Sequence, residues 1–125
     1  MAAADPHDRH HTWAADALRK HAPFHTCEAV VLETAWVIGT PVAVLGLLAR
    51  GDLVIDPAFD FAVEIPRLLE LCRKYHDRSM DLADACLVRM TELTVRCKIW
   101  TVDRSDFSAY RRHGRQPVPC EFPAP

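Results

Sequence analysis

RSMDLADACLVRMTEL, residues 78–93, places two carboxylates three positions apart at the start of an apolar helical pattern. Asp81 and Asp84 stand where this helix should begin, and apolar residues then recur at helical spacing at positions 82, 85, 86, 87, 90 and 93. Asp81 can cap the helix, and Asp84 can lie in its first turn, where a negative charge favours the positive end of the helix dipole. The alternative is that Asp84 is held at the edge of the core because it has a chemical function.

The length and composition limit the classes of fold and function to which this chain can belong. A chain of 125 residues with half of them hydrophobic fits a single domain, residues 1–125, with a real core. A formal net charge of −2 excludes a chain that binds nucleic acid through its overall charge, so any phosphate contact must come from a local patch. No apolar run approaches the ~20 residues of a membrane span, and we therefore expect no membrane partner.

The cysteines and glycines exclude several kinds of site. There are five cysteines, an odd number, and none has C-x-x-C spacing, which favours a reduced, cytoplasmic compartment and disfavours a structural zinc site. The four glycines form neither a phosphate-binding loop nor a dinucleotide-binding fingerprint. Three histidines near the N-terminus, at positions 7, 10 and 11, are expected to be exposed residues and not a metal cluster.

Helical and extended patterns alternate along the chain. We predict helices over 8–21, 27–39, 41–49, 59–77 and 82–96, and extended segments over 24–26, 52–56 and 98–102, with an edge strand possible around 118–121. Thr26 is the expected N-cap of the second helix and Gly39 its end. Pro66 should kink or split the fourth helix, and DRSDF, residues 103–107, should be a loop. Trp13, Trp36 and Trp100 lie in apolar patterns and are expected in the core.

This alternation is typical of an α/β domain with a parallel sheet. Ligands of such sheets bind at the carboxyl ends of the strands. Asp103 follows the strand predicted over 98–102, and the loop before Asp84 should open on the same edge. Carboxylates from separate segments are therefore expected to converge there.

Two motifs together resemble the C-terminal half of a PIN domain of the VapC toxin type: MDLADACLVRMTEL, 80–93, and TVDRSDFSAYRRHGR, 101–115. TCEAVVLETAW, 26–36, resembles the second helix of that family, and the likeness extends from about residue 7 to about 121. The resemblance implies a three-layer α/β fold in which helices flank a central, mainly parallel sheet. By motif position, it makes Glu33, Asp84 and Asp103 the catalytic and metal-binding carboxylates, with Asp81 and Asp106 as possible additional ones.

The resemblance also implies an activity and partners. The family cuts RNA with carboxylate-bound Mg²⁺ or Mn²⁺, and hard divalent ions do prefer oxygen ligands. It further implies a cognate antitoxin that masks the site, and a homodimer. Arginines of the C-terminal motif are candidates for contact with RNA phosphates, although a solvated basic loop would contain the same residues: Arg104, Arg111, Arg112 and Arg115.

The chain departs from the family pattern at its start. The family begins with an interior strand that ends in a metal-binding aspartate, whereas Met1–Ala4 leads directly into DPHDRHH, which resembles the segment after that strand. We therefore expect an impaired ribonuclease. Two alternatives stay open: a non-catalytic PIN remnant that binds an antitoxin or a partner chain, and an unrelated α/β domain in which all of these acids are helix caps.

Overall fold

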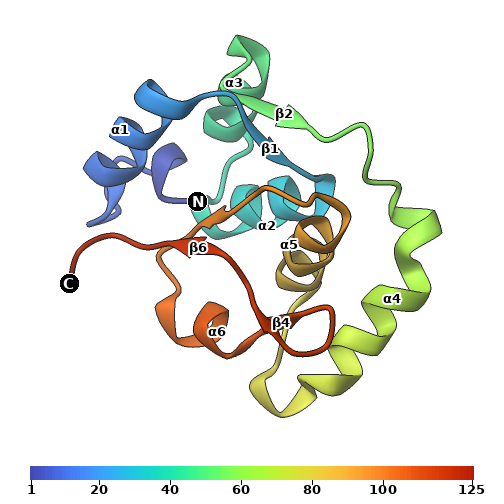
Figure 1. The fold of residues 1–125 in the computed structure, drawn as a ribbon. Helices are drawn as coiled ribbons and strands as arrows, with labels where there is room; N and C mark the ends of the chain where they lie inside the picture. The colour runs from blue at the N-terminus through green and yellow to red at the C-terminus, as the bar shows by residue number, and fades with distance from the viewer. The chain divides into compact units, whose positions relative to one another are not determined.

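The computed structural model describes all 125 residues, and contacts divide the chain into two compact units, Met1–Pro57 and Ala58–Pro125 (Figure 1). Both units mix helices with short strands, so the predicted α/β class is confirmed at this coarse level. None of the helices combines the length and the apolar character that crossing a membrane requires.

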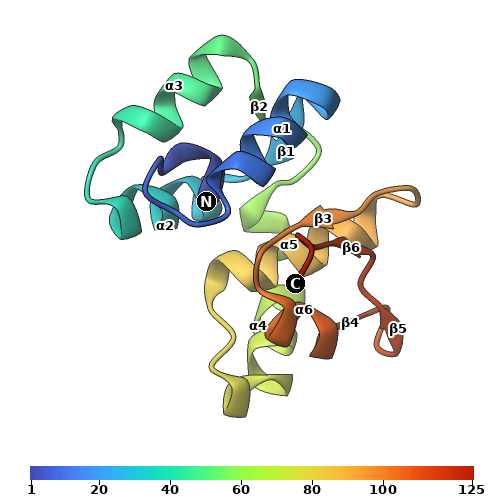
Figure 2. The ribbon, with the colours of Figure 1, turned by 90° about the vertical axis from the view of Figure 1, so that its left-hand side faces the viewer.

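The first unit builds one parallel strand pair around a helical crossover. Its order is η1 (Ala2–Ala4), α1 (His11–His21), β1 (Phe24–Thr26), α2 (Glu28–Ile38), α3 (Val42–Arg50) and β2 (Leu53–Ile55). β1 and β2 pair in parallel along their whole length, with Phe24 opposite Leu53, as the extended segments predicted. Ala4, Val44, Leu47 and Leu53 form the buried centre of this unit. The turn between α2 and α3 is visible in Figure 2.

The start of α2 differs from the prediction. Thr26 does not cap the helix, because it is the last residue of β1, and its buried Oγ1 has no hydrogen-bond partner. Strand pairing fixes Thr26 in an extended backbone with its side chain inside, and Cys27 is the residue before the helix. Gly39 does end α2, with a φ of 89° that a residue with a Cβ rarely adopts.

The core prediction for Trp36 is wrong. Its side chain is 86% exposed, while Trp13 and Trp100 are half-buried. The inward face of α2 instead passes through Val31, Thr34 and Ile38, and the Thr34 hydroxyl donates to the Val30 carbonyl at 2.8 Å. Trp36 is two positions from Thr34, which on a helix places it on the opposite face.

The second unit pairs two helices and adds a C-terminal set of short strands. Its order is α4 (Phe61–Lys74), η2 (His76–Arg78), α5 (Leu82–Leu93), β3 (Ile99–Trp100), α6 (Arg104–Ala109), β4 (Arg111–Arg112), β5 (Gln116–Pro117) and β6 (Cys120–Glu121). α4 packs against α5, and its helix runs through Pro66 without being split. Pro66 is exposed, so its ring lies toward solvent and only one helical hydrogen bond is lost.

Three elements of this unit correct the predicted boundaries. α5 ends at Leu93 and not near 96, and β3 contains only two residues. The expected loop over 103–107 is largely the helix α6, because Asp103 caps it. The predicted edge strand near 118–121 is confirmed as β6, which pairs with β3 in parallel.

The strands do not form one continuous sheet. They form three separate pairs: β1–β2 and β3–β6 are parallel, and β4–β5 is an antiparallel hairpin. The predicted parallel pairing is therefore confirmed, while a single central sheet of several strands is absent from the structure. Strands of two or three residues offer few hydrogen bonds, and each here pairs with one neighbour only.

Candidate functional site

Residues 78–93 contain the whole of α5, and the helix starts where the sequence predicts. Asp81 is the N-cap, and its Oδ1 accepts the backbone N–H of Asp84 at 2.8 Å. Asp84 is the third residue of the helix, where the dipole favours a negative charge. The capping function expected for Asp81 is confirmed, and the carboxylate of Asp84 remains for other contacts.

A second pair of aspartates repeats this arrangement at α6. Asp103 follows β3, and its Oδ1 accepts the backbone N–H of Asp106 at 3.0 Å. The N–H of Asp103 itself donates to the hydroxyl of Thr101 at 3.1 Å. Asp106 pairs with Arg78, whose Nη1 lies 3.1 Å from Oδ1. Both helix starts therefore present one capping acid and one acid in the first turn.

Asp84 is half-buried and belongs to a group of four carboxylates that we call the acidic cluster (Asp81, Asp84, Asp103 and Asp106). Burial raises the pKa of Asp84 to about 6; a hydrogen bond from the Tyr110 hydroxyl opposes the rise, and the charges of the other three carboxylates add to it. The Tyr110 hydroxyl donates to Oδ2 of Asp84 at 2.9 Å. The tyrosine ring is fully buried and packs edge-on against Tyr75 and Phe107.

The donor atoms of the acidic cluster suit a hydrated divalent cation. The hydrogen bonds and the ion pair use Oδ1 of Asp81, Asp103 and Asp106, and Oδ2 of Asp84. Each carboxylate therefore has a second oxygen to offer. Across the chain, no three acidic, histidine or cysteine side chains already form a metal-binding group. Mg²⁺ keeps several waters and needs only one or two carboxylates, so the chemistry of the donors fits this ion.

The other predicted metal ligand belongs to the first unit. Glu33 lies on α2 and is exposed. Two further acids of this unit stabilise turns: Asp5 accepts the N–H of His7 at 2.9 Å, and Asp8 accepts that of His10 at 2.8 Å. Of the five predicted carboxylates, the four of the second unit are thus the ones that occur together in one unit.

Most of the predicted RNA-binding arginines have contacts within the protein. Arg104 bonds the Pro123 carbonyl at 2.9 Å and lies over the Phe122 ring. Arg111 donates to three carbonyls at the end of α6, the nearest being that of Ser108 at 2.8 Å. Arg112 bonds the Thr91 carbonyl at 3.0 Å. Arg115 is exposed at the β4–β5 turn and is the one most available to a phosphate.

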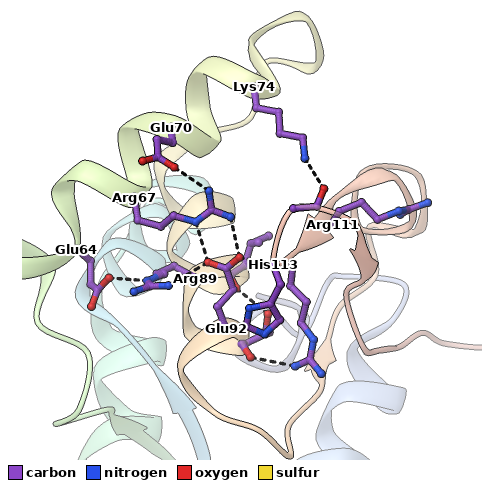
Figure 3. A network of polar contacts seen from close by, with 12 residues as sticks. Glu64, Arg67, Glu70, Lys74, Arg89, Glu92, Arg111 and His113 are labelled. Atoms are coloured by element: carbon purple, nitrogen blue, oxygen red, sulfur yellow. Dashed lines mark hydrogen bonds and ion pairs between the residues drawn. The ribbon is translucent and has the colours of Figure 1, made fainter.

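Sequence patterns did not reveal a second polar cluster, the Glu92 network, which joins α4, α5 and the β4–β5 hairpin (Figure 3). Glu92, with 2% of its side chain exposed, accepts hydrogen bonds from Arg67 at 2.9 and 2.7 Å and from Arg89 at 3.2 Å. The backbone N–H of His113 donates to the same carboxylate at 2.6 Å. The remaining members are Glu64, which accepts from Arg89 at 2.5 Å, and Glu70, which accepts from Arg67 at 3.1 Å.

In the Glu92 network the glutamates are paired with arginines, as expected of side chains that stabilise the fold. Burial opposes ionisation of Glu92, but the hydrogen bonds from Arg67, from the His113 backbone and from Arg89 outweigh it and lower its pKa to about 2. The sequence contains a signal for it, since Arg67 and Glu70, like Arg89 and Glu92, are three residues apart within helical patterns. The contacts across the helices have no such signal, because they join residues 25 positions apart.

Comparison with known proteins adds no family. No protein-family model matches the chain, and no curated protein matches it.

Proposed function

We propose that this chain is a PIN-like, metal-dependent endoribonuclease of the VapC toxin type, and that the acidic cluster is its metal site. One observation carries the proposal: Asp84 is a partly buried carboxylate whose pKa is raised to about 6, with three more carboxylates around it and no cation in direct contact with its oxygens. Burying charges of one sign together costs free energy, and a divalent cation removes that cost.

The residues of the chain have distinct tasks in this proposal. Asp84 and Asp103 would hold Mg²⁺ or Mn²⁺ through their second oxygens, with Asp81 and Asp106 as neighbouring acceptors for its water. The Tyr110 hydroxyl fixes the orientation of the Asp84 carboxylate by binding Oδ2 at 2.9 Å. When bound, the cation lowers the pKa of its water and stabilises charge on the phosphate. Glu33 is assigned to the site by the family resemblance alone, as are the antitoxin and the homodimer.

The parallel pairing of β1 with β2 and of β3 with β6 supports the PIN-like hypothesis in its simplest respect. Asp103 lies three residues after the end of β3, on the side of the carboxyl end of this parallel strand. Arg115 at the hairpin turn remains the arginine best placed to contact RNA.

One observation favours the non-catalytic alternative. Every carboxylate of the acidic cluster already has a partner in the protein: a helix N-terminus for Asp81 and Asp103, the Tyr110 hydroxyl for Asp84, and Arg78 for Asp106. A remnant that binds a partner chain without cutting RNA would need no more than this.

The test measures metal binding and RNA cleavage separately. We expect Mn²⁺ titrated into the chain to bind weakly, and Asp84→Asn to abolish that binding. Asp77→Asn is the matched control, because Asp77 is an exposed acid outside the cluster. In a single-stranded RNA cleavage assay with Mn²⁺, the chain should cleave the RNA, and EDTA and Asp84→Asn should each abolish the cleavage.

The possible results separate the hypotheses. Mn²⁺ binding without RNA cleavage would favour the hypothesis of a non-catalytic PIN remnant over that of a ribonuclease. If Mn²⁺ does not bind, or binds Asp84→Asn as tightly as the unchanged chain, the proposed metal site would be overturned. The hypothesis that these acids are only helix caps would then be favoured.

A further inference from the structure

A depression on the surface of the second unit adjoins the Glu92 network, whose side chains are drawn in Figure 3. It has a volume of about 360 Å³, and its lining comes from α4, α5 and the β4–β5 hairpin: Arg67, Glu70, Arg89, Glu92, His113 and Gly114. His113 lies in the turn of the hairpin with a φ of 53°, and the bond from its N–H to Glu92 holds it there. A ligand in this depression would therefore meet three elements that hydrogen bonds hold together.

The buried carboxylate of the depression has no capacity left for a ligand. Oε1 of Glu92 accepts from Arg67 and Arg89, and Oε2 accepts from Arg67 and from the N–H of His113. A carboxylate has about four lone-pair positions, so the two oxygens of Glu92 are saturated. The other carboxylate of the lining, that of Glu70, is 69% exposed to solvent. The depression is therefore poor in free acceptors.

The cationic side chains, in contrast, keep unused donors. Arg89 bonds carboxylates through Nε and Nη1, and its Nη2 has no partner in the structure. Arg67 uses each of its three nitrogens once, so both of its Nη atoms retain an N–H. The Lys74 ammonium donates to the Gly114 carbonyl at 2.9 Å and has two further N–H groups. A ligand that offers only acceptors would satisfy these donors.

The charge around the depression is positive even though its arginines are paired. Salt bridges join Arg67 and Arg89 to Glu64, Glu70 and Glu92, so the network itself carries a slight excess of negative charge.

The neighbouring cations reverse this sign, because they form no salt bridge with an acid: Lys74, Arg111, Arg112 and Arg115. Lys74 contacts the turn of the hairpin, and the three arginines belong to the hairpin or border it. An anion is therefore attracted to this part of the unit, although the whole chain has a formal net charge of −2.

We propose that this depression binds a phosphate group, which accepts hydrogen bonds from Arg89, Arg67 and Lys74. Phosphate oxygens point in tetrahedral directions and can serve donors from three side chains, and guanidinium groups bind phosphate through two parallel N–H bonds. A carboxylate has two acceptor oxygens in one plane and serves fewer donors. The phosphate is either free or part of a nucleic acid backbone. The site uses no residue of the acidic cluster and needs no metal, so it is independent of the proposed nuclease activity.

NMR spectra that resolve the backbone amides and the arginine Nε–H groups test this site. Inorganic phosphate, titrated into the whole chain in EDTA, should shift the signals of Arg67, Arg89 and Gly114 until they saturate. Acetate at the same concentrations should shift them much less. Arg89→Lys keeps the positive charge but removes Nη2, and should weaken phosphate binding about tenfold.

Lys74→Gln should weaken phosphate binding by a smaller factor. Lys74 is exposed, so this variant tests the site even if Arg89→Lys does not fold, which circular dichroism would show. Lys20→Gln is the matched control, because Lys20 is an exposed lysine on α1 of the first unit. It should leave the affinity for phosphate unchanged.

A single-stranded oligoribonucleotide in the same EDTA buffer identifies the source of the phosphate. If it shifts the same signals and inorganic phosphate displaces it, the ligand is a nucleic acid backbone; if only inorganic phosphate shifts them, the ligand is free phosphate. Both results support the site. The proposal would be overturned if these signals do not move, if acetate moves them equally, or if neither Arg89→Lys nor Lys74→Gln weakens binding.

Discussion

Two ends of α5 place carboxylates in opposite electrostatic situations. Near its start, burial and neighbouring acids raise the pKa of Asp84 to about 6. At its end, Glu92 is more deeply buried, yet hydrogen bonds from arginines and from a backbone N–H lower its pKa to about 2. The difference is the supply of cations: Glu92 has two guanidinium groups, whereas Asp84 has a neutral hydroxyl. Burial alone therefore does not distinguish the two carboxylates; the presence or absence of a balancing positive charge does.

Removing the charge of Glu92 should have the largest effect. Glu92→Gln leaves Arg67 and Arg89 without their shared partner, and should lower the free energy of unfolding by about 2–4 kcal/mol, reduced from the fully buried case because both arginines are partly exposed. Urea denaturation measures this, with Glu70→Gln as the exposed control at about 0–1 kcal/mol. Because the pKa is lowered, the stabilisation exists above the usual pKa of glutamate and is lost as the pH falls toward 2. Equal effects of the two substitutions would remove the contrast between the ends of α5.

Neutralising Asp84 should act in the opposite direction. Folding disfavours its charged form, so Asp84→Asn should raise the free energy of unfolding at about pH 8 by about 1–2 kcal/mol, a value reduced for partial exposure. As the pH falls below about 6, the folded wild type takes up a proton before the unfolded chain does, and the difference should close. Thermal unfolding followed from pH 8 to 4 measures it. A clear loss of stability in Asp84→Asn at pH 8 would count against a repulsive carboxylate cluster.

Tyr110→Phe should sharpen the assignment of Asp84. The hydroxyl stabilises the charged carboxylate, so its removal should raise the pKa of Asp84 further and cost about 1 kcal/mol of stability. A carbon-detected NMR titration of the aspartates reports that pKa directly. Tyr75→Phe is the matched control, because its hydroxyl accepts the backbone N–H of Arg111 instead. It should cost similar stability and leave the pKa of Asp84 where it is. An unchanged pKa in Tyr110→Phe would show that the hydroxyl does not bind this carboxylate in solution.

Arg78→Gln should have the smallest effect on stability. Arg78 pairs with Asp106 at the surface, with 44% of its own side chain exposed, and such pairs contribute about 0–1 kcal/mol. The same substitution removes the one cation that contacts the acidic cluster. If the cluster binds a metal, Mn²⁺ affinity should rise in Arg78→Gln, because a competing positive charge is gone. Weaker Mn²⁺ binding would instead mean that Arg78 holds Asp106 in place for the ion.

The order of secondary structure was largely predictable from the sequence. The helical spacing of apolar residues, Gly39 and Gly51 located the helices of the first unit, and the extended segments predicted over 24–26 and 52–56 contain β1 and β2. Asp81 as the cap of α5 followed from its position before the apolar pattern. Two predictions were wrong because the same residue can serve in two kinds of structure. Thr26 can cap a helix or pair within a strand, and Asp103 can follow a strand in a loop or cap a helix.

The sequence by itself determined where the longer helices and the strands β1, β2, β3 and β6 form and which acids stand at the start of α5 and after β3, because periodicity and capping act over a few residues; it did not reveal α6 or the β4–β5 hairpin. Only the tertiary structure decided that Trp36 is exposed, that Tyr110 holds Asp84, and that Arg67 and Arg89 balance Glu92. These outcomes depend on which surfaces meet, and Asp84 is joined to Tyr110 across 26 positions of the chain. The pKa of a carboxylate is set by the groups around it in space, and the packing of the helices chooses those groups.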